Sequence, residues 1–552
     1  MRTSEPGRRQ EHIEHDPATT AETMTRQIRP EDAHSIAPDI VADAPAPPPS
    51  QDAAGRSAFA SGLARGPQDA TSLPPLDHAA IRTIIAGIMV AMFISALEQT
   101  IVAPALPAIG RSLGNIDDLS WVVTSYLLAA TAATPLFGKL TDIHGRRAIM
   151  LLAIGIFILG SLACALAPTM WVLIVGRGLQ GIGGGGLIPI AQTIIADLLT
   201  PRERPMAQSY TSVVFLSASV LGPVLGGLLT DHLHWSFIFW INLPLGAIAL
   251  VMTARALRRL PRYDRPHKLD IPGVALMVAA AIALLLALDW GGTHYRWMSS
   301  QTWALIGCSV VLWALFAVRL LTAREPFIPL AILGGRVTSA ITCAAFFSIG
   351  TLVGVTIFAP LYCQMVLGVS ASMSGLALIA FLAGTTVGAL IMGRLIVRLS
   401  HYMRVPIVGL LIAIATFAIL AIETSELSLL SFTALLGVLG VAIGPMYPAS
   451  TIVMQNGVKA HQLGTATGAL NFFRLLGGAI VVAAFGAIVL GSAGGGVMRL
   501  EKLQAAHADF GPAFRMVFVA GALFLLVALG CVMAVEERPL HGPIRLADPA
   551  AD

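Results

Sequence analysis

The sequence has 552 residues, of which 56% are hydrophobic and only 12% are charged. Soluble globular proteins carry roughly 25% charged residues, so this composition excludes an ordinary water-soluble protein. The mean hydropathy is +0.77, and apolar runs of about 20 residues recur, which is the length that crosses the hydrocarbon core of a bilayer. We therefore expect an all-α polytopic membrane protein.

Residues 1–80 differ from the rest of the chain because they are polar and contain the low-complexity run Ala44–Pro49. Such a segment cannot bury enough apolar surface to offset its ordering entropy, so we predict a disordered cytoplasmic tail. No apolar stretch occurs before residue 30. We expect no cleavable signal peptide, and the first spanning segment then acts as its own insertion signal.

Fourteen apolar segments follow, separated by polar residues, glycine and proline. We predict spanning helices at 82–106, 119–138, 148–167, 171–197, 206–229, 235–254, 271–290, 302–321, 337–361, 373–396, 403–422, 429–453, 463–490 and 513–535. An even number of spans places both termini on the same side of the membrane.

Lysine and arginine near the helix ends indicate which side that is. If the N-terminus is cytoplasmic, the lysines and arginines near the outer ends of the helices are limited to Arg111, Arg296, Arg499, Lys502 and Arg515. Many more lysines and arginines lie near the inner ends, and they include the basic stretch 255–268. By the positive-inside rule both termini are cytoplasmic, and this stretch is an inner loop rather than a nucleic-acid-binding patch.

The loop after the second span reads GKLTDIHGRR, from Gly138 to Arg147. Gly138 and Gly145 permit a tight turn and a close helix approach, while Asp142 can pair with Arg146 or Arg147. This string resembles the signature between the second and third helices of the major facilitator superfamily. The resemblance implies that Asp142 and Arg146 belong to a cytoplasmic gate that stabilises an outward-open state.

Two further strings resemble the same family at the expected places. RGLQGIG, from Arg177, resembles its buried-arginine motif, and GPVLGG resembles the motif that marks its antiporters. In the second string, Gly222, Pro223, Gly226 and Gly227 suit a kinked and closely packed helix. Glycines alone are equally explained by ordinary helix packing, and the upstream Ser217 and Ser219 depart from the usual glycines.

Other strings are similar to the fourteen-helix drug:proton antiporter branch of this family. They are Leu97–Pro107, where Glu98 replaces the more usual aspartate, and also His234–Gly246, Trp290–Gly292 and Asn471–Arg474. The resemblance covers residues 82–535. It implies two six-helix bundles, at 81–256 and 337–536, with two inserted helices within 257–336 and a second cytoplasmic tail at 537–552.

The branch also implies a function: proton-driven export of amphipathic drugs or toxic compounds across the bacterial inner membrane by alternating access. A periplasmic adaptor and an outer-membrane channel are candidate partners, as for some relatives in double-membraned bacteria. The run Gly183–Gly186 lacks the lysine of a P-loop, and the five cysteines are scattered singly. We expect no nucleotide site, no cofactor and no metal.

Glu98 and Arg177 are the ionisable residues of greatest interest because charges at bilayer depth usually mark ion or proton paths. Glu98 lies about 16 residues into the first span and Arg177 about 6 residues into the oppositely directed fourth span, so their depths coincide. We hypothesise that Glu98 carries the coupling proton and attracts cationic substrate, while Arg177 tunes it. A purely structural ion pair is the alternative.

Other polar residues at membrane depth are weaker candidates for lining a substrate cavity, because polar residues also join helices together. Pro445–Pro448 indicates a broken segment of the kind that lines transporter cavities. The candidates are Gln99, Tyr126, Gln180, Asn242, Tyr447, Gln455 and Arg474.

Several other functions compete with multidrug export. A transporter of the same fold could export one metabolite, siderophore or lipid, or import a nutrient, although Gly222 and Pro223 argue against import. A membrane sensor that does not transport would not need both the gate and the proton motifs. A membrane enzyme would require a nucleophile and base or a metal constellation, and the spans contain neither.

Overall fold

The computed structural model describes residues 78–114, 118–259, 269–291, 295–323, 325–396, 398–399, 401–424, 426–492 and 510–537. All described elements belong to Leu73–Asp552, one of the two compact units of the chain. Nearly all of both predicted tails lies outside the described residues. The first helix begins at His78, slightly inside the predicted N-terminal tail.

The regular secondary structure of the described residues is helical, apart from an isolated β-bridge between Gly291 and Tyr295. The first bundle contains α2 (His78–Ile101), α3 (Leu106–Leu113), α4 (Leu119–His144), α5 (Arg146–Ala165), α6 (Met170–Leu198), α7 (Arg204–His232), α8 (Phe237–Trp240) and α9 (Asn242–Ala256). The second contains α13 (Arg336–Met365), α14 (Ala371–Leu395), α15 (Arg404–Ile422), α16 (Leu429–Ile443), α17 (Met446–Asn456), α18 (Leu463–Ser492) and α20 (Gly511–Met533).

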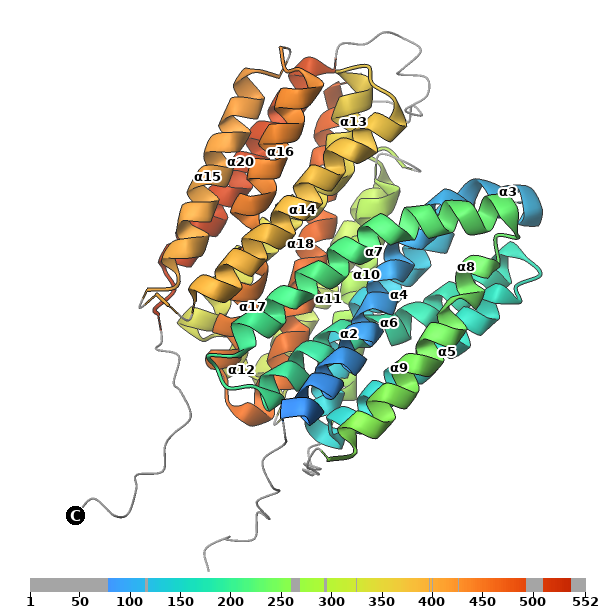
Figure 1. Ribbon diagram of the computed structural model, residues 1–552, viewed down its shortest axis with the longest axis vertical. Coiled ribbons are helices and arrows are strands. Elements are labelled where there is room, and N and C mark those ends of the chain that lie inside the picture. Colours follow the sequence, from blue (N-terminus) through green and yellow to red (C-terminus); the bar gives the residue numbers. More distant parts are fainter. Residues whose placement is uncertain are drawn as a thin grey trace, which may run out of the picture. The chain divides into compact units, whose positions relative to one another are not determined.

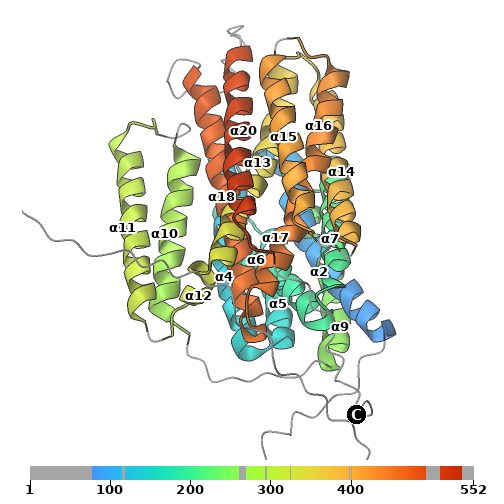
Figure 2. The ribbon, with the colours of Figure 1, turned by 90° about the vertical axis from the view of Figure 1, so that its left-hand side faces the viewer.

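Between the bundles come α10 (Ile271–Trp290), α11 (Ser300–Thr322) and the short α12 (Leu330–Leu333). Helices α10 and α11 pack against each other and stand as a pair beside the other helices (Figure 2). Arg319 of α11 forms an ion pair with Asp270 at 2.9 Å, and Asp270 also caps the N-terminus of α10. This contact joins the two inserted helices at one end.

Among the described residues, fourteen helices are long and apolar enough to span a membrane. This confirms the predicted number and the predicted fold class of two six-helix bundles with two inserted helices. The first span is longer than predicted, running from Ile81 to Leu113. It is interrupted by a short 3₁₀ turn, Ala103–Ala105, followed by α3, because Pro104 and Pro107 cannot donate backbone hydrogen bonds.

The predicted break in the twelfth span is also present. Helix α16 ends at Ile443 and α17 begins at Met446, directly after Pro445.

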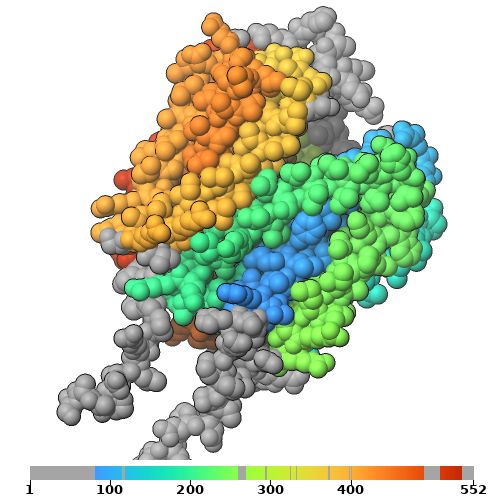
Figure 3. All heavy atoms as spheres, viewed as in Figure 1, coloured from blue at the N-terminus to red at the C-terminus, as the bar shows by residue number. Residues whose placement is uncertain are grey.

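The two bundles meet mainly where α7 packs against α14 and where α4 packs against α18, and α6 also contacts α18. Helix α7 lies between α2 of its own bundle and α14 of the other (Figures 1 and 3), and α4 packs against α18. Within the first bundle α6 packs against α4 and α5, and within the second α13 packs against α18 and α20.

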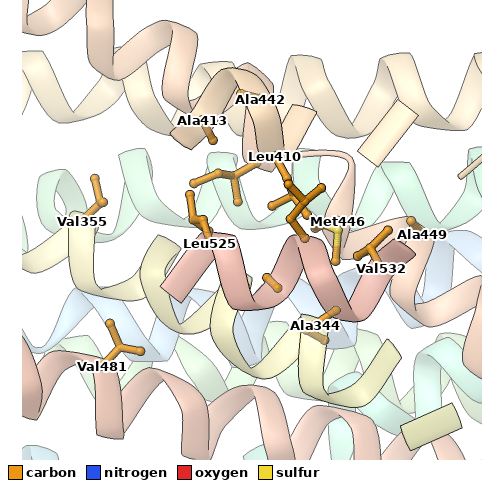
Figure 4. Close-up of a cluster of buried hydrophobic side chains, with 14 of the residues drawn as sticks. Ala344, Val355, Leu410, Ala413, Ala442, Met446, Ala449, Val481, Leu525 and Val532 are labelled. Atoms are coloured by element: carbon orange, nitrogen blue, oxygen red, sulfur yellow. The ribbon is translucent and has the colours of Figure 1, made fainter. Parts of the chain in front are cut away.

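Apolar side chains fill the interior of the second bundle (Figure 4). Val355, Leu410, Val481 and Leu525 are buried there, contributed by α13, α15, α18 and α20. Large apolar side chains also cover the outside, as on α11, where Val310, Val311, Leu315, Val318 and Leu321 are exposed. An apolar exterior is what a helix facing lipid requires.

Candidate functional site

Glu98 is completely buried in α2 and forms an ion pair with Arg177 of α6. Its second carboxylate oxygen accepts a hydrogen bond from the Asn242 side chain, at the start of α9. Three helices thus converge on one carboxylate. Since an isolated buried charge costs several kcal/mol, this pairing explains how α2 and α6 tolerate ionised side chains at membrane depth.

Arg177 has several partners besides Glu98. Its Nε donates to the carbonyl oxygen of Val122 at 2.9 Å, and Nη1 donates to Gln180 Oε1 at 2.6 Å. Its guanidinium carbon lies 4.4 Å from the centre of the Tyr126 ring, a cation–π contact. Gln180 in turn donates to Ser161 Oγ at 2.7 Å. Arg177 therefore remains partly satisfied even without the carboxylate.

We call Glu98, Tyr126, Ser161, Arg177, Gln180 and Asn242 the Glu98 cluster. The structure brings the sequence-predicted residues Tyr126, Gln180 and Asn242 into it, and Ser161 was not anticipated. Gln99 is not part of it: its side chain is exposed and donates back to the Ser95 carbonyl of its own helix. Neighbouring residues on a helix point about 100° apart, which separates Gln99 from Glu98.

The second group of predicted residues lies where α4 meets α18. Asp142 Oδ1 pairs with Arg146 Nη1 at 2.7 Å and accepts from the Gly464 N–H at 3.0 Å. Its Oδ2 accepts from the N–H and the hydroxyl of Thr465, both at 2.7 Å. Gly464 and Thr465 are in the first turn of α18, whose free N–H groups favour an anion. Asp142 thus forms hydrogen bonds that join the two bundles.

Arg146 extends this contact to α6, because its Nε donates to Asp197 Oδ2 at 2.8 Å. Gly145 has a positive φ of 84°, which glycine adopts without strain and which allows the turn between α4 and α5. Gly138 faces α18, where a Cβ would lie 3.0 Å from the Gly468 Cα. Arg147, the last residue of this motif, has a buried Nε without a hydrogen-bond partner.

The residues of the GPVLGG string do not all behave alike. A Cβ on Gly222 would collide with the Thr100 side chain, and one on Gly226 with the Ile101 backbone. Gly227 has open space around its Cβ position, and Pro223 is exposed. Gly222 and Gly226 therefore permit the close packing of α7 on α2, whereas Pro223 and Gly227 lie away from that contact.

Arg474 of α18 is buried in a separate cluster at the junction with α17. Its Nη2 donates to the Tyr447 carbonyl at 2.9 Å, to Ser450 Oγ at 2.7 Å and to Thr451 Oγ1 at 2.8 Å. Its guanidinium carbon lies 4.2 Å from the centre of the Tyr447 ring. With Asn471, which accepts from Nη1 at 3.3 Å, these residues form what we call the Arg474 cluster.

Gln192 of α6 connects this cluster to the first bundle. Its Oε1 accepts from Asn471 Nδ2 at 2.7 Å, and its Nε2 donates to the Tyr447 hydroxyl at 3.2 Å. Its backbone carbonyl accepts from Gln455 Nε2 at 3.2 Å. The sequence-predicted Tyr447, Gln455 and Arg474 are therefore close to one another but in a different cluster from Glu98.

Sequence reasoning missed Gln192, Asp197 and Thr465. A signal existed for the first two, because Gln192 is an uncharged polar residue and Asp197 an acidic residue within one apolar span. Thr465 carries no local signal, since its importance comes from a contact with a residue 323 positions away. Within the described residues, no group of three His, Cys, Asp or Glu side chains could hold a metal ion.

Several known proteins are similar to this chain. The Multidrug transporter protein MdtP of Bacillus subtilis is 32% identical over 461 residues, covering 83% of this chain and 85% of that protein. Multidrug resistance protein 3 of the same organism is 32% identical over 413 residues, covering 74% of this chain and 80% of that protein. The efflux pump dotC of Dothistroma septosporum is 30% identical, covering 80% of this chain and 76% of that protein.

Solved structures share the fold at low identity. The human organic anion transporter MFSD10 superposes with a TM-score of 0.56 at 16% identity, covering 80% of this chain and 99% of that chain. The proton:xylose symporter XylE gives 0.55 at 13% identity, covering 82% and 96%. The family profile described as Major Facilitator Superfamily matches residues 88–482. Together with the fourteen apolar helices in two bundles, this match shows that the chain is a multi-pass membrane protein of the Major Facilitator Superfamily.

Proposed function

We propose that this chain exports amphipathic drugs or toxic compounds across the bacterial inner membrane in exchange for protons. The observation that carries the proposal is the buried ion pair between Glu98 and Arg177. A membrane-embedded carboxylate that must change partners is a suitable proton carrier. The names of the relatives, multidrug transporter and efflux pump, support drug export as the direction and class of transport.

Proton uptake by Glu98 would weaken its pairing with Arg177, since the neutral carboxyl is no longer an anion. The surroundings suit both protonation states. Arg177 keeps Val122, Gln180 and the Tyr126 ring as partners. Asn242 has a buried Oδ1 without a hydrogen-bond partner. A rotation of that amide would present Oδ1 as an acceptor for the proton of a neutral Glu98.

The contacts of Asp142 support its proposed role in a cytoplasmic gate. The end of α4 and the start of α18 are cytoplasmic by the positive-inside rule, and Asp142, Gly464 and Thr465 join them. Arg204 also donates to Asn456 Oδ1 across the bundles at 3.3 Å, and Ser209 to the Ala389 carbonyl at 2.7 Å. A cycle of alternating access would break these contacts to open the inside.

The remaining parts of the proposal follow from the resemblance and the charge pattern. Both termini would be cytoplasmic, and the bundles would extend over 81–256 and 337–536. Residues of the Glu98 and Arg474 clusters, with Gln455, would face the substrate during the cycle. A periplasmic adaptor and an outer-membrane channel are candidate partners.

Transport by the purified full-length protein in proteoliposomes tests this function. An imposed pH gradient should drive uptake of a fluorescent cationic dye into inside-out oriented vesicles. Glu98→Gln should reduce that uptake by about tenfold or more, because a general proton-transfer group typically contributes about 10²-fold or more. The matched control is Glu423→Gln, an exposed carboxylate at the end of α15, which should transport normally. Undiminished gradient-driven uptake by Glu98→Gln would refute proton coupling through Glu98.

A further inference from the structure

Arg474 is a buried cation whose known partners are all uncharged. It is 3% exposed, and no carboxylate among the described residues forms an ion pair with it. Arg146 and Arg177, by contrast, each pair with a carboxylate of another helix, Asp142 and Glu98 respectively. An uncompensated charge in a membrane protein is expensive and usually marks a functional site.

The hydrogen bonds of Arg474 do not by themselves account for its presence. Ser450 Oγ also donates to the Met446 carbonyl, and Thr451 Oγ1 donates to the Tyr447 carbonyl. The hydroxyl groups of Ser450 and Thr451 would therefore keep a hydrogen-bond partner if the guanidinium were absent. In addition, Arg474 Nε is buried and makes no hydrogen bond, so one strong donor is unused.

The guanidinium lies beside the start of α17. Its partners Tyr447, Ser450 and Thr451 lie in the first two turns of α17, which begins at Met446. The N–H groups at this end are already used, since Tyr447 donates to the Gly444 carbonyl and Ala449 to the Pro445 carbonyl. A buried arginine with an unused N–H is a suitable binding site for an oxyanion.

The ring of Tyr447 lies over this arginine and contacts the opposite bundle. Its ring covers the guanidinium at 4.2 Å, and its hydroxyl accepts from Gln192 of the opposite bundle at 3.2 Å. The edge of Phe215, from α7, packs on the same ring. Gln192 lies close to the end of α6 that is cytoplasmic by the charge rule. Separation of α6 from α17 at that end would release Tyr447 and uncover Arg474 toward the cytoplasm.

We propose that the Arg474 cluster binds the carboxylate of a transported compound, and that carboxylate-bearing, zwitterionic amphiphiles are therefore among the substrates. This inference rests on the proposed function of small-molecule export. The carboxylate supplies the counter-charge that Arg474 lacks, and Nε provides a free donor for it. Because the site opens toward the cytoplasm, it would load from the inside, as export requires.

A matched pair of dyes tests the proposal: rhodamine B, which has a free carboxylate, and its ethyl ester, which has none. Binding to the purified full-length protein is measured by fluorescence anisotropy, which needs no proton gradient. Arg474→Gln should weaken binding of rhodamine B by about tenfold or more, the usual effect of losing a charge-assisted hydrogen bond. Binding of the ester should change by less than about twofold.

Two further variants complete the design. Arg474→Lys keeps the charge but loses the planar donor fork, so it should weaken rhodamine B binding less than Arg474→Gln and leave the ester unchanged. If Arg474→Gln does not fold, this variant decides the comparison. Arg515→Gln, at an exposed position in the second turn of α20, is the control and should bind both dyes normally.

The outcomes separate the two proposals. An equal effect of Arg474→Gln on both dyes, no effect on either, or a wild-type protein that binds neither dye would overturn the carboxylate site. If rhodamine B binds in an Arg474-dependent way but no pH gradient moves either dye, the export function and the assignment of rhodamine B as a substrate fail, while the carboxylate-binding site stands.

Discussion

Asp142 and Thr465 are joined by two hydrogen bonds of 2.7 Å, donated by the backbone N–H and the hydroxyl of Thr465. Asp142 lies in the last turn of α4, and Thr465 lies in the first turn of α18. The carboxylate thus acts as an N-terminal cap for a helix of the other bundle. A cap supplied across the bundle interface stabilises the closed arrangement of these helix ends and is lost when they separate.

Asp142→Asn should slow transport by about tenfold, because hydrogen bonds to a charged acceptor contribute about 1.5–3 kcal/mol and a neutral amide has one acceptor oxygen fewer. The initial rate of dye transport in proteoliposomes measures the effect. Asp231→Asn, an exposed aspartate near the end of α7, is the matched control. Equal rates for both variants would show that Asp142 does not limit the cycle.

Gly138→Ala should impair the contact between α4 and α18. The new methyl group would collide with the Gly464 carbonyl and lie 3.0 Å from the Gly468 Cα, so the helices must move apart, at a cost of about 1–3 kcal/mol. We expect a lower unfolding temperature and slower transport. Gly155→Ala, in α5, meets no atom within 4 Å and should be harmless. A Gly138→Ala protein with normal stability and transport would contradict the close packing.

Gly226→Ala and Gly227→Ala should differ sharply although they are adjacent. The first places a methyl group against the Ile101 carbonyl of α2, and the second places it in open space. We expect Gly226→Ala to destabilise the protein by about 1–3 kcal/mol and Gly227→Ala to leave stability unchanged or raise it slightly. Thermal unfolding in detergent measures both. If both variants lose the same stability, these glycines are needed for the flexibility of α7 and not for its contact with α2.

Arg177→Gln should be more harmful alone than together with Glu98→Gln. The single change leaves a buried carboxylate unpaired, which costs about 3–5 kcal/mol, whereas replacing both partners removes the charge as well. We therefore expect the unfolding temperature of the double variant to exceed that of Arg177→Gln. Neither variant should couple transport to a pH gradient. If the double variant is the less stable one, the two side chains do not act as a pair.

Much of the architecture could be predicted from the sequence, because transfer of a segment into a bilayer depends on summed local hydropathy. The fourteen spans were predicted in this way and are present. The break at Pro445 was predicted from the prolines at 445 and 448 and is also present. The end of the first span was predicted too early, because α3 continues it to Leu113 beyond Pro107. The motifs of residues 138–147 and 222–227 were predicted from the family resemblance.

The site was only partly predictable. Depth along two helices suggested that Glu98 and Arg177 lie at one level, but depth does not determine the rotation of either helix. Gln99 illustrates this: it is adjacent to Glu98 in sequence, yet it is exposed and bonds to Ser95 of its own helix. Gln455 and Arg474 were assigned to the same cavity as Tyr126, whereas their contacts lie in a second cluster around Tyr447 and Gln192.

The sequence by itself determined that this chain spans a membrane fourteen times, since hydropathy and charge are additive properties of local segments. Only the tertiary structure decided which polar side chains meet. Glu98 and Arg177 are 79 positions apart, and Asn471 and Gln192 are 279 positions apart. Such contacts depend on how each helix is rotated and packed, and small residues such as Gly138 and Gly226 set that packing through neighbours that no local pattern specifies.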